Sequence, residues 1–227
     1  MHDYLQLFHD KKLVLIMSLP HNDPALSQAA FRAGADAVKV HINVEHRASG
    51  THFGRLAEEK PAFDVMLSQA SGPMGLVLGG NPEGVAADAA EAAVLPFAFH
   101  SVYAHHLPAR LIGCGTPLMA ACDGSYTPEE IVQMPACGAN VLEASVIPGT
   151  EYGSPLCMRD LLTYRRIAAS VPVPVVVPTQ RRILPEDVPA LVRCRVRGLM
   201  IGAVVTGKRE DSIVQAVTAF RRAIDAL

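Results

Sequence analysis

The sequence predicts an α/β protein, a single (βα)8 TIM barrel that spans residues 1–227. Strand-like and helix-like segments alternate along the whole chain, which is typical of a parallel sheet covered by helices. Eight strand-like segments are spaced roughly evenly, and seven of them precede a helical pattern, whereas a doubly wound sheet of this length needs fewer strands. No linker, low-complexity tract or short repeat divides the chain, so we expect one domain.

The first half of the chain supplies four predicted strands and three predicted helices. The strands are apolar runs that suit burial on both faces. Asp23-Pro24 and Asn81-Pro82 are typical helix starts, and Gly34 is a typical helix end. The predicted strands are residues 13–19, 37–44, 74–79 and 98–103, and the predicted helices are residues 24–33, 61–69 and 82–93. Residues 46–54 are expected to be a polar loop.

The middle of the chain contains the weakest unit of the pattern. The segment of residues 104–115 is short and contains Pro108, so it leaves little room for a helix. A strand is then predicted over residues 117–122, and Thr127-Pro128 starts a helix that Gly138 closes. A strand over residues 140–145 and a helix over residues 156–170 complete this part, joined by a loop over residues 146–155.

The last unit, residues 173–207, is the stretch that most directly suggests a function. An apolar strand over residues 173–177 leads through a polar turn to a helix start at residues 185–187. A second strand, residues 198–205, contains Gly202, and a closing amphipathic helix covers residues 211–225. The last two turns of such a barrel commonly bind phosphate. Gly202 and Ala203 would then offer backbone N–H groups to an anion, although the glycines also suit ordinary turns.

Composition excludes several classes of protein. The formal net charge of −2 gives no electrostatic case for nucleic acid, and no apolar run is long enough to cross a bilayer. The amino terminus is a poor secretion signal. Five cysteines without a CxxC spacing are expected to be reduced thiols of a cytoplasmic protein, with Cys122 at a strand end. No cofactor is indicated.

Chemistry in a (βα)8 barrel belongs at the carboxyl ends of the strands. The polar residues predicted there are Ser18, Lys39, His41, His100, Asp123, Glu143, Ser145, Thr179 and Gln180. Strand alternation puts Lys39 and His41 on one side. An interior lysine is costly unless it is paired or deprotonated, so Lys39 is the strongest candidate. It would act as imine nucleophile, general base or cation for a substrate oxygen, or form a structural ion pair with Glu143.

The other catalytic candidates have equally plain alternatives. Glu143 would be an acid/base partner or the counter-ion of Lys39, and Asp123 would act in catalysis or form an Asx-turn in Asp-Gly-Ser. His41 would shuttle a proton or be a hydrogen-bonded core histidine. Histidines near Glu45 and in the fourth unit raise the possibility of a metal, but no spacing such as HExxH brings them together, so no metal ligand is assigned.

Arg181 and Arg182 follow the seventh strand directly and are candidate phosphate clamps, because guanidinium binds phosphate in a bidentate manner. Gln180 lies in the same turn. Tyr152-Gly153, in the loop after the sixth strand, is a candidate lid over the site.

Three motifs carry a resemblance to a known family. They are residues 118–130, which include LMA and TPEE, residues 182–187 (RILPED) and residues 201–206 (IGAVVT). In order and spacing the chain resembles the phosphate-binding barrels of the ribulose-phosphate-binding superfamily, and within it the N-acetylmannosamine-6-phosphate 2-epimerases. The resemblance implies a phosphate near Arg182, Gly202 and Ala203. The epimerases carry a lysine where this chain has Leu78-Gly79-Gly80, and a glutamate and glycine where it has Gln180-Arg181.

Since both expected acid/base groups of the epimerases are replaced, the epimerase activity itself is not inferred. The sequence predicts an enzyme acting on a small phosphorylated sugar or carbonyl compound, either an isomerase/epimerase or a carbon–carbon lyase. Lys39 would be its base or imine nucleophile, and Glu143 and Asp123 its proton-transfer partners. The alternatives are a phospho-metabolite-binding protein without catalysis and a metal-dependent enzyme that uses the loop histidines. A homo-oligomer is possible, without an identifiable interface.

Overall fold

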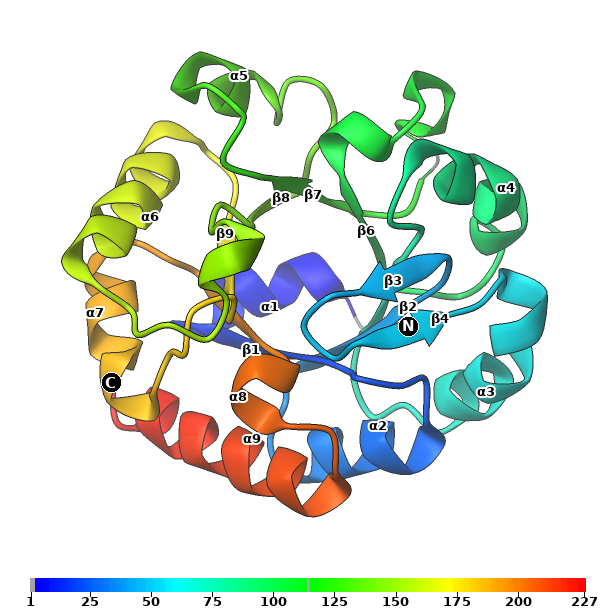
Figure 1. Ribbon diagram of the computed structural model, residues 1–227, viewed down its shortest axis with the longest axis horizontal. Helices are drawn as coiled ribbons and strands as arrows, with labels where there is room; N and C mark the ends of the chain where they lie inside the picture. Colours follow the sequence, from blue (N-terminus) through cyan, green and yellow to red (C-terminus); the bar gives the residue numbers. More distant parts are fainter. Residues whose placement is uncertain (1–2, 114) are drawn as a thin grey trace.

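The fold is a closed barrel, described in a computed structural model for residues 3–113 and 115–227. Within these residues eight parallel strands close into one ring in the order β1-β10-β9-β8-β7-β6-β5-β2 (Figure 1), which confirms the predicted (βα)8 TIM barrel. The strands are β1 (Val14–Ser18), β2 (Ala37–His41), β5 (Met74–Val77), β6 (Phe99–Tyr103), β7 (Leu118–Cys122), β8 (Val141–Ala144), β9 (Val175–Pro178) and β10 (Gly198–Ile201).

The outer helices begin at caps that the sequence shows. The Asp23 carboxylate accepts from the amides of Ala25 and Leu26, and the Asn81 side chain accepts from the Gly84 amide. These caps satisfy N–H groups that have no partner within the helix. The helices are α2 (Pro24–Arg32), α3 (Leu56–Ser68), α4 (Pro82–Ala92), α5 (Pro128–Gln133), α6 (Met158–Ser170), α7 (Val188–Arg193) and α9 (Glu210–Asp225).

Two segments differ from the predicted pattern at the functional end of the barrel. The strand expected over residues 198–205 ends at Ile201, and α8 (Ala203–Thr206) follows. The chain turns at Gly202, whose N–H donates to the Thr179 hydroxyl at 3.0 Å instead of continuing the sheet. The expected polar loop contains an antiparallel hairpin, β3 (Val44–His46) and β4 (Thr51–Phe53).

Two further differences concern helices. Residues 104–113 form two short 3-10 turns, η1 (Ala104–His106) and η2 (Ala109–Leu111), and Pro108 lies between them. The helix expected to start at Pro61 begins five residues earlier, because the Glu58 carboxylate accepts from the Arg55 amide and caps it. α3 tolerates Pro61 in its second turn.

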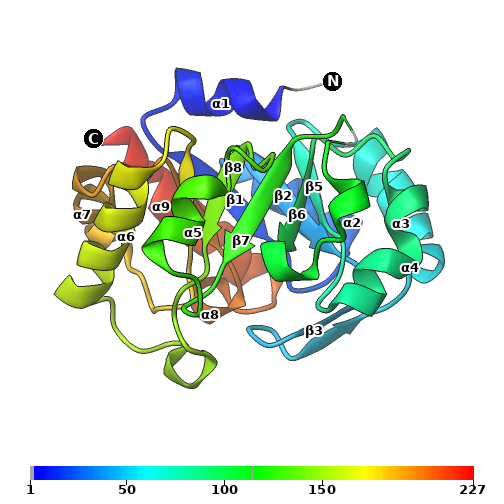
Figure 2. The same cartoon turned by 90° about the horizontal axis from the view of Figure 1, so that it is seen from above.

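The interior of the barrel is apolar toward the amino-terminal ends of its strands. Here α1 (Tyr4–Asp10) covers the amino-terminal end of the ring, opposite the β3–β4 hairpin (Figure 2), and inserts Tyr4 and Phe8 among the inward side chains. The Tyr4 ring stacks on Phe99 at 3.9 Å between centroids. Gly75 makes room for that stack, since a Cβ there would lie 2.1 Å from the Phe99 ring. A second, larger apolar layer lies between the strands and the helices.

The cysteines that the structure describes are not paired in disulfides. Cys122, Cys137, Cys157 and Cys194 are free thiols, and Cys114 lies outside the described residues. Burial, with Glu143 nearby, raises the pKa of Cys122 to about 12, so this thiol is a poor nucleophile. In the described residues, no helix combines the length and the apolar character that a membrane span requires.

Candidate active site

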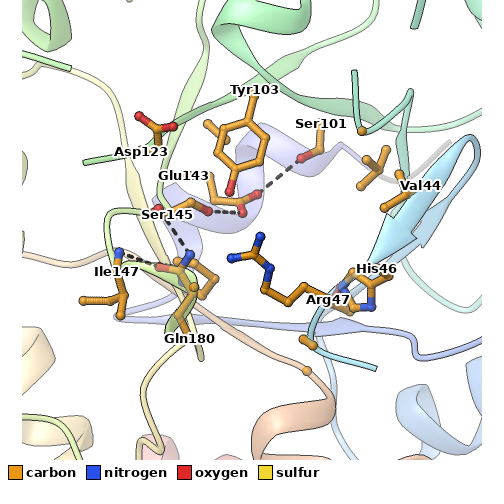
Figure 3. Close-up of a pocket in the computed structure, with 18 of the residues that line it drawn as sticks. Val44, His46, Arg47, Ser101, Tyr103, Asp123, Glu143, Ser145, Ile147 and Gln180 are labelled. Carbon is orange, nitrogen blue, oxygen red and sulfur yellow. Dashed lines mark hydrogen bonds between the residues drawn. The ribbon is translucent and has the colours of Figure 1, made fainter. Parts of the chain in front are cut away.

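A cavity of about 690 Å³ opens at the carboxyl ends of the strands. Its wall is made by side chains from the strand ends, by the β3–β4 hairpin and by the loops after β8 and β10 (Figure 3). The sequence-predicted residues that line it are Ser18, Lys39, His41, Asp123, Glu143, Ser145, Thr179, Gln180 and Gly202. Most of the predicted strand-end residues are therefore brought together at one opening.

Lys39 and Glu143 form an ion pair in the wall of this cavity. The Lys39 Nζ lies 3.1 Å from Glu143 Oε2, although the two residues are 104 positions apart in the chain. Ser101 donates to the same carboxylate oxygen at 3.3 Å, and Ser145 donates to Oε1 at 2.7 Å. Both charged side chains are more than nine-tenths buried. The interior of the barrel thus holds a charge pair in which both carboxylate oxygens are hydrogen-bonded.

His41 and His46 form an aromatic cluster with Phe53 beside this pair. The His41 ring lies 4.7 Å from the His46 ring and 4.6 Å from Phe53, and its Nε2 faces the Ser18 hydroxyl at 3.4 Å. Burial, followed by His46 and Lys39, holds the pKa of His41 well below its usual range. Burial and Lys39 lower the pKa of His46 to about 4. Both imidazoles are therefore neutral at neutral pH.

Gln180 belongs to the cavity wall but its amide is already engaged by the protein. Its oxygen accepts from the Ile147 amide at 3.1 Å, and its nitrogen donates to the Ser145 carbonyl at 3.2 Å (Figure 3). The same nitrogen donates to the Tyr152 hydroxyl at 2.7 Å. Burial raises the pKa of Tyr152, although the Gln180 bond and Arg47 oppose the shift. Gln180 thereby fixes the loop after β8, including Tyr152, against the barrel.

The structure does not place Arg181 and Arg182 in the cavity, where the sequence predicted a phosphate clamp. The buried Arg181 pairs with Asp160 at 3.0 Å and with Glu151 at 2.6 Å, and neither arginine lines the cavity. Arg182 is exposed, and its backbone N–H donates to the Ser154 carbonyl. Gln180 takes the inward position of this turn, which directs the next side chain toward α6. The local sequence does not show that Arg181 points toward α6, because its partner Asp160 lies 21 positions earlier in the chain.

Asp123 lines the cavity and also forms the Asx-turn that its sequence suggests. Its carboxylate accepts from the Ser125 amide at 2.9 Å and the Ser125 hydroxyl at 2.6 Å. Burial raises the pKa of Asp123, but the two bonds from Ser125 outweigh it and leave the pKa below its usual value. Asp123 is thus a carboxylate at neutral pH.

The loop histidines do not converge on a common point. The His46 Nδ1 lies 2.7 Å from the Ser49 hydroxyl, and the exposed His52 pairs with Glu45 at 2.5 Å. His100 is buried beside the Ala92 backbone and does not line the cavity. Among the residues that the structure describes, no three His, Cys, Asp or Glu side chains are placed to hold a metal ion.

Several cavity residues were not singled out from the sequence. Ser101 and Tyr103 alternate along β6 and both face inward, so the period of two in residues 98–103 would have indicated them. Burial, followed by Glu143, raises the pKa of Tyr103, which keeps its hydroxyl protonated. Arg47 lies in the turn of the β3–β4 hairpin and points into the cavity in Figure 3. No local pattern distinguishes it from a solvated loop arginine.

Comparison with known proteins gives the fold but not a family. No protein-family profile and no curated protein matches this chain. Among solved structures, thiamine phosphate pyrophosphorylase from Pyrococcus furiosus is 16% identical, with a TM-score of 0.64 over 95% of this chain and 97% of that one.

Two further structures resemble the chain equally broadly. A mutant tryptophan synthase α-subunit from Pyrococcus furiosus is 16% identical, with a TM-score of 0.72 over 91% of this chain and 97% of that one. A structure described as native KDPGal is 20% identical, with a TM-score of 0.68 over 96% and 97%. At these identities the similarity shows the TIM-barrel fold, and the likeness to the ribulose-phosphate-binding barrels and their epimerases stays a prediction.

Proposed function

We propose that the protein is an enzyme acting on a small phosphorylated sugar or carbonyl compound, as an isomerase/epimerase or a carbon–carbon lyase. The observation that carries the proposal is the Lys39–Glu143 pair, which lies at the open end of the barrel and lines the cavity. The name of one structural neighbour, thiamine phosphate pyrophosphorylase, contains a phosphate compound, which supports this substrate class.

The ion pair supports two kinds of chemistry on a carbonyl compound. In a lyase, Glu143 would accept a proton from Lys39, and the free amine would attack the carbonyl carbon to give an imine and release water. In an isomerase, Glu143 would remove the proton next to the carbonyl, and the Lys39 ammonium would stabilise the oxyanion that develops. His41 and Asp123 border the same space and would pass protons to and from it.

The proposed phosphate position is the turn between β10 and α8. In a helix the first amides have no carbonyl partner before them, so those of Ala203 and Val204 are left for a ligand. Gly202 lines the cavity and would leave room for the phosphate, but its own N–H donates to Thr179, so it would not serve as the donor that the sequence predicted. Gln180 holds the loop after β8 beside the cavity, and Arg181 would act only by tying the turn after β9 to α6.

Lys39→Met tests the proposal directly. We expect the wild type to convert a member of a sugar-phosphate panel, and the variant to lose at least about 100-fold in kcat, since a catalytic acid, base or nucleophile contributes this much. Borohydride trapping of a covalent adduct would assign the lyase route, and solvent-deuterium exchange without trapping would assign the isomerase route. Lys60→Ala, on the exposed face of α3, is the matched control.

Removal of Lys39 leaves Glu143 buried without its counter-ion, so folding must be measured alongside activity. Losing one partner of a buried pair costs about 3–5 kcal/mol. Lys39→Met combined with Glu143→Leu removes both charges and is expected to recover most of this stability. Full turnover by a folded Lys39→Met variant would remove Lys39 from the mechanism.

One observation favours a second candidate, a phospho-metabolite-binding protein without catalysis. Both oxygens of Glu143 are already satisfied by Lys39, Ser101 and Ser145, so the network is complete without a substrate. This candidate predicts that sugar phosphates raise the melting temperature of the protein, while no member of the panel is turned over by the wild type.

A further inference from the structure

Arg47 is a cation over the cavity for which the described part of the chain supplies no partner. It lies in the turn between β3 and β4, and no hydrogen bond or ion pair joins its guanidinium to a described residue. Lys39, which lines the same cavity, is buried and is neutralised by Glu143, whereas Arg47 is an exposed residue at the cavity mouth. Figure 3 shows the Arg47 side chain directed into the cavity toward Glu143 and Ser145.

The guanidinium of Arg47 lies against the backbone of Gly149 in the loop after β8. A Cβ at Gly149 would be 1.3 Å from Arg47 Nη1 and 2.5 Å from its Cζ. The backbone of Gly149 does not itself demand glycine, because its φ is not positive. Glycine at position 149 therefore makes room for the Arg47 guanidinium, which lies between the hairpin and the loop after β8.

The hairpin that carries Arg47 is held firmly at its base. The Asn43 side chain donates to the Asp88 carboxylate at 2.8 Å and to the Gly84 carbonyl at 3.0 Å, which ties the hairpin to α4. His46, which precedes Arg47, lies on Phe53 and bonds Ser49 within the turn. The arginine is thus presented by a fixed turn, which lowers the entropy lost when it binds a ligand.

We propose that Arg47 forms an oxyanion-binding subsite at the mouth of the cavity and holds a phosphate or carboxylate group of the ligand. Guanidinium presents paired N–H donors that match either group, and here all of them are free of protein acceptors among the described residues. Because the guanidinium is borne on the hairpin and reaches the loop after β8, an anion bound there would also link these two walls. The inference rests on the proposed function only in using the same cavity.

Binding of small anions tests the subsite without any assumption about the reaction. Melting temperature is measured against inorganic phosphate, and separately against acetate, at constant ionic strength. Stabilisation that Arg47→Ala abolishes would assign the anion to Arg47, for phosphate alone or for both anions, because the turn between β10 and α8 is unchanged in that variant. We expect Arg47→Ala to weaken phosphate binding about 10-fold or more, as for loss of a charged hydrogen-bond partner.

Gly149→Ala is the sharper variant because it leaves Arg47 in place and takes its space. We expect it to weaken phosphate binding about as much as Arg47→Ala, and Arg47→Lys to be intermediate because the charge remains but the paired donors are lost. Arg166→Ala, on the exposed face of α6, is the control and should bind phosphate like the wild type. Circular dichroism confirms that each variant is folded.

The outcomes separate this inference from the proposed function. Unchanged phosphate affinity in both Arg47→Ala and Gly149→Ala would overturn the subsite, whatever the enzyme turns over. Loss of phosphate binding in both variants, in a wild type that converts no sugar phosphate, would support the subsite and reject the catalytic proposal. Retained phosphate binding in Lys39→Met would further separate the subsite from the catalytic pair.

Discussion

Glu143 is the residue through which the polar layer of the barrel is organised. Its two oxygens accept from Lys39, Ser101 and Ser145. Burial, and after it the charge of Glu143, raises the pKa of both Tyr103 and Tyr4. A buried carboxylate is tolerated only when it is paired and hydrogen-bonded in this way. The same arrangement leaves a charged pair in the cavity wall, where it would contact a bound ligand.

At the residue scale we predict an acid-sensitive stability that originates in the histidines. The folded pKa of His46 is about 4, below its ordinary 6.5, and that of His41 is lowered in the same direction. The unfolded chain therefore binds more protons below pH 6.5, so the stability from these groups is complete above pH 6.5 and is lost as pH falls toward 4.

Urea unfolding between pH 7.5 and 4.5 measures this effect. His46→Gln should make the free energy of unfolding less dependent on pH across that range, and an identical slope in variant and wild type would contradict the prediction. The effect is separable from that of Asp88, whose hydrogen bond with Arg55 lowers its pKa to about 2. The stability from Asp88 is lost only below pH 3.8, as pH falls toward 2.

At the element scale, two short elements without a clear sequence signal complete the barrel. The β3–β4 hairpin brings Arg47 and His46 over the carboxyl end, and α1 fills the amino-terminal end with Tyr4 and Phe8. Each is held by contacts with residues distant in the chain. Neither is long enough to be stable by itself.

The contribution of α1 can be measured with Phe8→Ala. Phe8 is 4% exposed and packs edge-on against Tyr4 at 5.2 Å between ring centroids. Removing its ring from the floor of the barrel is expected to cost about 3–5 kcal/mol of unfolding free energy in urea denaturation. Gln6→Ala, on the exposed side of the same helix, should change stability by less than about 0.5 kcal/mol. Equal effects of the two would show that α1 is not a packed part of the core.

At the scale of the whole molecule, the two ends of the chain close the ring. β1 pairs in parallel with β10, with Val14 opposite Gly198 and Met17 opposite Ile201. α9 covers this junction and buries Ile213, Val217, Phe220 and Ile224. The single domain over residues 1–227 stays a prediction, which this closure supports because neither half of the ring has all of its strand edges paired alone.

Truncation after Arg197 tests the single domain. It removes β10, α8 and α9 and leaves β1 and β9 as unpaired edges. We expect the truncated chain to lose cooperative thermal unfolding and the near-ultraviolet circular dichroism of its tyrosines. A cooperative transition in the shortened chain would show that the remaining residues form an independent domain.

Much of the fold could be predicted from local signals. Apolar runs gave the eight strands, and Asp23-Pro24, Asn81-Pro82 and Thr127-Pro128 gave three helix starts within a residue. One boundary failed where a contact distant in sequence decides it, and another failed at a local helix cap that the sequence analysis did not use. Gly202 ends β10 because its amide bonds Thr179, and Glu58 starts α3 before Pro61.

The candidate site was predictable only in part, for the same reason. Alternation along a strand shows that Lys39 and His41 share a side, but only closure of the ring brings Lys39 to 3.1 Å from Glu143. The two arginines after β9 look like a phosphate clamp until Asp160 of α6 is seen to hold Arg181.

The sequence by itself determined the barrel, since the period of apolar residues and the caps are properties of neighbouring residues. The tertiary structure alone decided which polar side chains meet, that Arg181 faces α6, and that Arg47 reaches the cavity over Gly149. The physical reason is that local patterns fix which face a side chain takes. The partners on that face depend on how the strands close and where the loops fold back.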